Sequence, residues 1–220
     1  MVLIFEGHDF DLKPTKIVAV ARNYGAHAIE MKANVPSQPH FFLKPPSALV
    51  ADNGEVILPK ASTRVEHEVE LSVIMKSRAK RVSPESIKEK ILGYTVLIDV
   101  TARDIQAKAK KNGMPWTIAK GYDTFAPIGP RIVPGHAVDE NNLDIWLKIN
   151  GEYRQRSNTS QMIFPVAHLV SYISHIMTLE PMDVIATGTP SGVGPIEDGD
   201  LIEAGIEHIG VLQVKAMHEH

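Results

Sequence analysis

Two glutamates that stand two positions apart, Glu68 and Glu70, are the residues of this chain best suited to chemistry. They lie in EHEVELSVIM, residues 66–75, where alternating and then continuous apolar residues predict a strand that enters a core. Side chains two positions apart on a strand point to the same face, so the two carboxylates lie side by side. Such a pair is costly in a core unless it is neutralised, and a bound cation would neutralise it.

A third carboxylate, Asp99, ends the apolar segment YTVLID, residues 94–99. Three carboxylates with open positions for water and substrate suit Mg²⁺ or Mn²⁺. The alternative is an exposed edge strand with solvated glutamates, and the spacing alone does not decide between the two. Glu66 shares the face of the two glutamates but lies one step further out. His67 points to the opposite face, where a core or surface histidine is expected rather than a ligand.

His27 and Glu30 stand three residues apart in GAHAIEMK, residues 25–32, which suits a short helix. Residues at this spacing share a helix face, and a histidine oriented by a carboxylate is a general-base arrangement. An ordinary pair on a helix surface is the alternative.

Three further segments carry polar residues that could contact a substrate. Arg103 and Gln106 form another pair three apart, and the arginine could clamp a carboxylate with two hydrogen bonds or be solvated. Lys120 lies in the mostly apolar TIAKGY, where a desolvated lysine could stabilise an oxyanion or be structural. The turn GTPSGVGP does not fit a dinucleotide fingerprint. Two interpretations stay open: the turn brings Thr189 near a ligand, or it is a plain loop.

The elements that must position these residues are mainly strands. We expect strands over 16–21, 66–75, 94–99, 143–151 and 183–188, a final hairpin over 200–216, and helices over 25–32, 84–90, 102–111 and from Pro165. Gly93 is expected to stop the second helix, and Thr101 with Asp104 forms a capping-box pattern. The proline-broken segment 37–49 is expected to be extended and irregular. Strands outnumber helices without regular βαβ alternation, so we predict an α+β fold with a mixed, curled sheet.

Composition excludes several classes of function. The chain has 220 residues, 44% of them hydrophobic and 22% charged, with a net charge of -3, which argues against a nucleic-acid or anionic-lipid surface. A basic run at residues 76–81 lacks interleaved aromatics and is expected to be a solvated loop. The absence of cysteine excludes disulfides, thiolate nucleophiles and zinc–cysteine sites. Neither a signal peptide nor an apolar run of about 20 residues is found, so we expect a cytoplasmic protein that binds no membrane.

Many spaced segments, in order, resemble the fumarylacetoacetate hydrolase family over about residues 16–216. The similarity is greatest to its short acylpyruvase and oxaloacetate decarboxylase branch, which lacks a separate N-terminal domain. The matching segments are VARNYGAHAIEM, PHFFLKPPSAL, VEHEVELSVIM, GYTVLIDVTARDIQ, PWTIAKGYDTFAPIGP, LKINGEYRQ, TSQMIF, TLEPMDVIATGTPSGVGP and GDLIEAGI.

The resemblance implies a β-rich mixed-sheet roll. It also implies one catalytic domain over residues 16–220 after a short extension over 1–15, and a homodimer. The implied residue roles are a Mg²⁺ or Mn²⁺ site at Glu68, Glu70 and Asp99, a mobile-lid pair at His27 and Glu30, and substrate and oxyanion positions at Arg103, Gln106, Lys120 and Thr189. Glu66 is not part of the family pattern.

The activity that the resemblance implies is Mg²⁺-dependent cleavage of a C–C bond in a small 2-oxo acid through a metal-stabilised enolate. Acylpyruvate hydrolysis and oxaloacetate decarboxylation are the first expectation. The alternatives are an isomerase or decarboxylase of the 2-hydroxyhepta-2,4-dienedioate type, an oxaloacetate keto–enol tautomerase, and a non-catalytic metal-binding module. Hydrolysis, decarboxylation and keto–enol or double-bond isomerisation share the enolate, so the sequence does not separate them.

Overall fold

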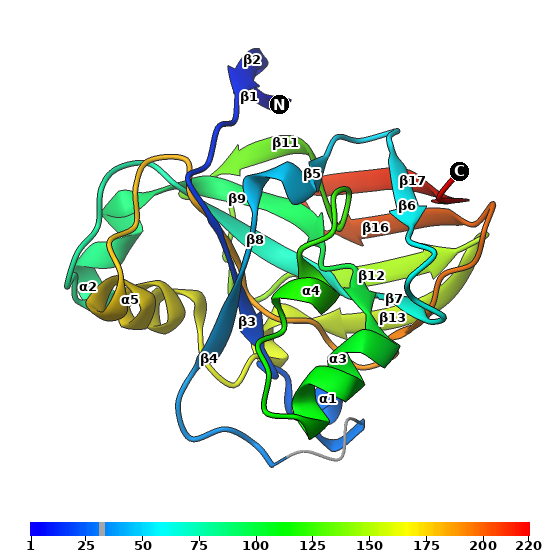
Figure 1. The fold of residues 1–220 in the computed structure, drawn as a ribbon. Coiled ribbons are helices and arrows are strands. Elements are labelled where there is room, and N and C mark those ends of the chain that lie inside the picture. The colour runs from blue at the N-terminus through cyan, green and yellow to red at the C-terminus, as the bar shows by residue number, and fades with distance from the viewer. Residues whose placement is uncertain (31–33) are drawn as a thin grey trace.

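The computed structural model describes residues 1–30 and 34–220, and its largest element is a nine-stranded sheet (Figure 1). The strands follow the order β2-β1-β11-β9-β8-β14-β3-β4, and β5 pairs with β11. The β1–β11, β5–β11 and β3–β14 pairs are parallel and the others are antiparallel, which confirms the mixed sheet. The bounds are β1 (Val2–Phe5), β2 (His8–Asp11), β3 (Ile17–Ala21), β4 (His40–Lys44), β5 (Leu49–Val50), β8 (Val69–Met75), β9 (Ile91–Ile98), β11 (Ala126–Pro134) and β14 (Val184–Ala186).

A five-stranded sheet of order β13-β12-β16-β17-β6 packs against the main sheet. Buried residues of β8 and β9 share one hydrophobic cluster with those of β12, β16 and β17, so the core lies between the two sheets. A small third sheet has the order β10-β7-β15. The bounds are β6 (Glu55–Leu58), β7 (Val65–His67), β10 (Thr101–Ala102), β12 (Asp144–Ile149), β13 (Glu152–Asn158), β15 (Gly194–Pro195), β16 (Leu201–Ile206) and β17 (Gly210–His218).

The helices are short and lie at two places (Figure 1). The helices α2 and α5 pack together on one side, and α5 buries an apolar stripe in the core. The helices α1, α3 and α4 gather near β3 and β4 on the other side (Figure 1). No helix in the described ranges is long and apolar enough to span a membrane. The bounds are α1 (Gly25–Glu30), α2 (Pro84–Ile87), α3 (Arg103–Lys111), α4 (Thr117–Lys120) and α5 (Val166–Ile176), with 3₁₀ helices at Pro46–Ala48, Lys88–Lys90 and Thr159–Gln161.

Most expected elements are confirmed, including the exposed basic loop over residues 76–81. The helix expected over 25–32 is present to Glu30, and the rest of that prediction lies outside the described residues. The irregular segment expected over 37–49 contains the regular strand β4.

Two local predictions were wrong. Gly93 lies inside β9 instead of ending a helix. Strand β11 passes so close that a Cβ at this position would stand 2.1 Å from the backbone oxygen of Val133, and the position therefore requires glycine. The capping box is absent: α3 begins at Arg103, while Thr101 Oγ1 donates to a backbone oxygen and Asp104 accepts from Ser62 Oγ.

The strand predicted over 66–75 is interrupted at Glu68, where the chain changes sheets. Strand β7 pairs with β10 and β15, whereas β8 continues into the main sheet beside β9 and β14. Glu68 therefore lies at the junction of two sheets, and its carboxylate accepts hydrogen bonds from Arg103 on α3 and Lys120 on α4.

Candidate active site

Strand register brings the three predicted carboxylates together. Val69 pairs with Ile98, and the backbone N–H of Asp99 donates to Glu68 O over 2.8 Å, so Glu68 and Asp99 face each other across the two strands. Glu70 lies one alternation further along β8. One oxygen from each carboxylate lies within 4.8 Å of the others, and all three residues are buried. The expectation that these side chains share one place is confirmed, and the solvated edge strand is excluded.

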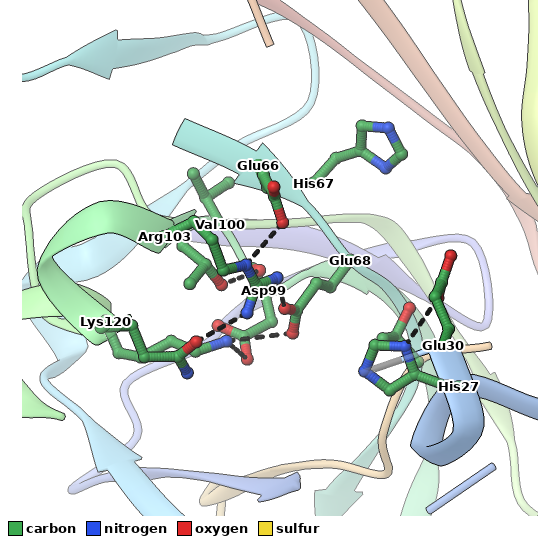
Figure 2. A network of polar contacts seen from close by, with 12 residues as sticks. His27, Glu30, Glu66, His67, Glu68, Asp99, Val100, Arg103 and Lys120 are labelled. Carbon is green, nitrogen blue, oxygen red and sulfur yellow. Dashed lines mark hydrogen bonds and ion pairs between the residues drawn. The ribbon is translucent and has the colours of Figure 1, made fainter. Parts of the chain in front are cut away.

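Two buried lysines bond to this cluster, and Figure 2 labels one of them, Lys120. Lys120 Nζ at the end of α4 donates to Asp99 Oδ2 over 2.6 Å and to Glu68 Oε2 over 3.0 Å. Lys44 Nζ at the end of β4 donates to Asp99 Oδ1 over 2.6 Å and to Val100 O over 3.1 Å. Each ammonium group has three N–H donors, so each keeps one for another acceptor.

Arg103 at the start of α3 is already bonded to protein groups. Its guanidinium donates to Glu66 through Nε, to Glu68 through one terminal nitrogen, and to Gln106 Oε1 over 2.6 Å through the other (Figure 2). Glu66 is buried and also accepts from Arg64 Nε over 2.6 Å. Glu66 is thus bonded to arginines and is not one of the three clustered carboxylates, so it lies one step further out, as expected. Arg103 and Gln106 do line the cavity, which is compatible with their predicted substrate contact.

The charges of the cluster fit a divalent cation. Burial raises the pKa of Glu70 well above its usual value, and the carboxylates of Asp99 and Glu68 raise it further. Burial also opposes ionisation of Glu68, but Lys120 and Arg103 outweigh it and lower its pKa. Glu70 Oε2 accepts the Gly188 N–H over 2.7 Å, whereas Lys44, Lys120 and Arg103 bond to Asp99 and Glu68, so no cation in the described residues forms an ion pair with Glu70.

A buried hydroxyl near Glu70 is also left unsatisfied. The hydroxyl of Tyr24 has no hydrogen-bond partner in the described part of the chain. Burial and the nearby charge of Glu70 raise its pKa. Three buried carboxylates with oxygen-only donors, one lacking its countercharge, fit Mg²⁺ or Mn²⁺.

The pair on α1 reaches the same cavity. His27 Nδ1 lies 3.1 Å from Glu30 Oε2, and His27 is buried and lines the cavity beside Glu68 and Glu70. Glu30 Oε1 accepts the backbone N–H of Gly192 over 3.0 Å, which fixes the carboxylate against the loop after β14. Because the carboxylate accepts from Nδ1–H, the other ring nitrogen of His27 is left basic.

Thr189 is held by a residue that the sequence analysis missed. Gln155 on β13 is buried; its Nε2 donates to Thr189 Oγ1 over 2.8 Å, and its Oε1 accepts the Val69 N–H over 3.0 Å. His67 Nδ1 lies 3.0 Å from the same Oε1, so His67 is the expected core histidine, turned away from the carboxylates (Figure 2). Thr189 Oγ1 donates to Val69 O over 2.8 Å, which ties its loop to β8.

Several of these residues, Glu68 and Glu70 among them, line a cavity of about 230 Å³. It opens between β3, β8 and the helices α1, α3 and α4, and its size suits a small organic acid. Its lining residues are Val20, Ala21, Arg22, His27, Phe42, Glu68, Glu70, Arg103, Gln106, Lys110, Trp116, Lys120 and Thr189.

Comparison with known proteins shows the family of the chain. A sequence model of the fumarylacetoacetate (FAA) hydrolase C-terminal family matches residues 16–216. The mitochondrial oxaloacetate tautomerase FAHD1 of Arabidopsis thaliana is 49% identical over 200 residues, 90% of this chain and 89% of the relative. The mitochondrial oxaloacetate decarboxylase of Dictyostelium discoideum is 47% identical over 192 residues, 87% of this chain and 88% of the relative.

A solved structure of fumarylpyruvate hydrolase from Pseudomonas aeruginosa, in complex with Mn²⁺ and pyruvate, has a TM-score of 0.94 at 36% identity. The match covers 100% of this chain and 96% of that one. The fold predicted from the resemblance is therefore confirmed, and the chain belongs to the fumarylacetoacetate hydrolase family.

Proposed function

We propose that this protein is a divalent-metal-dependent enzyme that cleaves a C–C bond in 2-oxo acids, by acylpyruvate hydrolysis and by oxaloacetate decarboxylation. One observation carries the proposal: a buried carboxylate cluster and a carboxylate-oriented histidine open into the same small cavity. The fumarylpyruvate hydrolase complex with Mn²⁺ and pyruvate supports it, since pyruvate is the fragment that acylpyruvate hydrolysis releases.

When bound by Glu68, Glu70 and Asp99, Mg²⁺ or Mn²⁺ supplies a Lewis acid that polarises the 2-oxo group and stabilises the enolate left when a bond to C3 breaks. Lys44 and Lys120 hold both oxygens of Asp99 in place, and Arg103 with Lys120 holds Glu68. These bonds fix the ligand oxygens before substrate arrives.

In hydrolysis, His27 removes a proton from water as the water oxygen attacks the acyl carbonyl. Glu30 stabilises the resulting imidazolium through the bond to Nδ1. Lys120 lines the cavity, and its third N–H is available for the oxyanion at the acyl carbon. The C3–acyl bond then breaks, its electron pair forms the pyruvate enolate, and C3 takes up a proton.

A second candidate is keto–enol tautomerisation or double-bond isomerisation. The Arabidopsis relative is named an oxaloacetate tautomerase, and a 42% identical structure from Mycobacterium smegmatis is a 5-carboxymethyl-2-hydroxymuconate delta-isomerase. The same basic nitrogen of His27 would then move a proton at C3, and no C–C bond would break.

A Mg²⁺-supplemented panel tests these reactions side by side with acetylpyruvate, fumarylpyruvate, oxaloacetate and 2-hydroxyhepta-2,4-dienedioate. Release of pyruvate from an acylpyruvate or from oxaloacetate is the expected result. Proton transfer without pyruvate release would replace the proposal by the second candidate, and no turnover of any substrate would contradict both.

We propose a homodimer as the assembly, which light scattering at the assay concentration measures.

A further inference from the structure

Two cations line the cavity outside the ion-pair cluster. Arg22 follows β3 and Lys110 lies on α3, and both reach the cavity that contains Glu68 and Glu70. Neither side chain forms an ion pair or a hydrogen bond with a residue in the described ranges 1–30 and 34–220. They therefore differ from the bonded cations of the cluster, which are Lys44, Arg103 and Lys120.

The backbone at Arg22 is held in an uncommon conformation. Its φ is 60°, in the left-handed region that a long side chain rarely adopts and that costs on the order of 1 kcal/mol. The next residue, Asn23, locks the backbone because its side chain bonds to Phe164 O, Phe164 N and Thr187 O at 2.8–3.0 Å. Strain that is fixed in this way concentrates at functional sites.

Aromatic side chains hold the second cation and form the wall beside it. Lys110 Nζ lies 5.0 Å from the centre of the Trp116 ring, and Trp116 packs edge-on against Phe42 at 5.5 Å. Partial burial lowers the pKa of Lys110, and the charge of Arg103 lowers it further. The charge of Arg22 also contributes to the lowered pKa of Lys110, so these two cations that line the cavity act on each other.

The cavity continues toward an apolar groove on this side. Arg22, Phe42 and Trp116 line both, and the groove adds Phe41, Leu43, Met114 and Pro115. A carbon chain that extends from the carboxylate cluster along this wall would pass Phe42 and Trp116 and end beside the two cations.

We propose that Arg22 and Lys110 form a second anion-binding subsite that takes the distal carboxylate of the substrate, so that the protein prefers 2-oxo dicarboxylates to 2-oxo monocarboxylates. The inference rests on the proposed function, since it places the 2-oxo end of the substrate at Glu68, Glu70 and Asp99. Two cations that form no ion pair or hydrogen bond within the described residues attract an anion, and a guanidinium can hold a carboxylate with two parallel hydrogen bonds.

Binding calorimetry on the Mg²⁺-loaded protein tests the subsite without turnover. The probes are 2-oxoglutarate and 2-oxoadipate, which lack a leaving group at C3, and their monocarboxylate counterparts of equal length, 2-oxopentanoate and 2-oxohexanoate. We expect at least one dicarboxylate to bind roughly tenfold or more tightly than its counterpart, the range of a charged hydrogen bond. Arg22→Gln and Lys110→Gln should each remove most of that difference and leave monocarboxylate binding within about twofold, and Arg22→Lys should retain part of it.

Lys108→Gln is the matched control, because Lys108 is exposed on the same helix two residues away and does not line the cavity. Equal binding of dicarboxylates and monocarboxylates by the wild type would overturn the subsite, as would equal losses in Lys108→Gln and Lys110→Gln. Acetylpyruvate hydrolysis without a dicarboxylate preference would overturn the subsite alone. Selective dicarboxylate binding without turnover of any panel substrate would support the subsite and contradict the proposed function.

Discussion

Replacing Glu70 by glutamine should stabilise the metal-free protein at a pH above the folded pKa of Glu70. Glutamine keeps the volume and an oxygen for the Gly188 N–H, but it removes a buried charge whose oxygen lies within 4.8 Å of oxygens of Glu68 and Asp99. Two unit charges at that separation repel by about 3 kcal/mol at an effective dielectric constant of about 20. Lys120 offsets part of this repulsion, so we expect the free energy of unfolding to rise by about 1–3 kcal/mol.

The gain should depend on pH. The pKa of Glu70 is raised in the folded protein. The stability that the protonated carboxyl contributes is therefore fully present below the pKa of Glu70 in the unfolded chain, and it is lost as pH rises through the pKa of Glu70 in the folded protein. Wild type and variant should therefore be similar near pH 4 and differ most above the folded pKa of Glu70. Mn²⁺ reverses the order, because the variant has lost a ligand and gains less stability from the ion.

Urea unfolding in EDTA and in saturating Mn²⁺, at several pH values, measures both effects. Glu66→Gln is the control: Glu66 is buried and bonded to Arg64 and Arg103, so this variant should lose stability in EDTA and keep its response to Mn²⁺. A Glu70→Gln protein that is less stable than wild type in EDTA at every pH measured would refute the electrostatic reasoning.

Four further substitutions test single residues. His27→Ala should lower acylpyruvate hydrolysis by roughly 10²–10⁴-fold and oxaloacetate decarboxylation far less, since only hydrolysis needs activated water. Glu30→Ala should show the same pattern with a smaller loss. Equal losses of both reactions, measured on one metal-saturated preparation, would remove the water-activation role of His27. Arg103→Lys keeps the charge but loses the forked guanidinium, so transition-state stabilisation measured from kcat/KM should fall by about 1–3 kcal/mol. Unchanged kcat/KM on every active substrate would leave Arg103 a structural role only. Lys44→Met should cost about 3–5 kcal/mol of unfolding free energy in EDTA, because Asp99 loses a buried partner, and an unchanged urea midpoint would contradict that ion pair.

The carboxylate cluster could be predicted because strand alternation is a local property. Glu68 and Glu70 share a face through their spacing, and His27 with Glu30 through helix geometry. Lys44 was missed because it lies beside prolines in a segment expected to be irregular, and its partner Asp99 is 55 residues away along the chain.

The remaining differences also come from tertiary pairing. Gly93 has the residue type of a helix stop, but the close approach of β11 gives it a place inside a strand. Gln155 resembles any polar strand residue, and its role depends on a loop that the chain reaches 34 residues later at Thr189. The break at Glu68 has no local signal, because the segment 66–75 alternates through it. Sequence patterns therefore predicted the three carboxylates and the histidine–glutamate pair, while the groups that hold them came from long-range contacts.

Metal dependence is the most direct test of the account. Protein stripped with EDTA should be titrated with Mg²⁺ and, separately, with Mn²⁺, while pyruvate release from the most active substrate of the panel is followed. The account predicts no turnover without metal, recovery that saturates at one ion per chain, and no recovery in Glu70→Ala at the same metal concentration despite a folded protein. Full activity in a sample shown to be free of metal would contradict it.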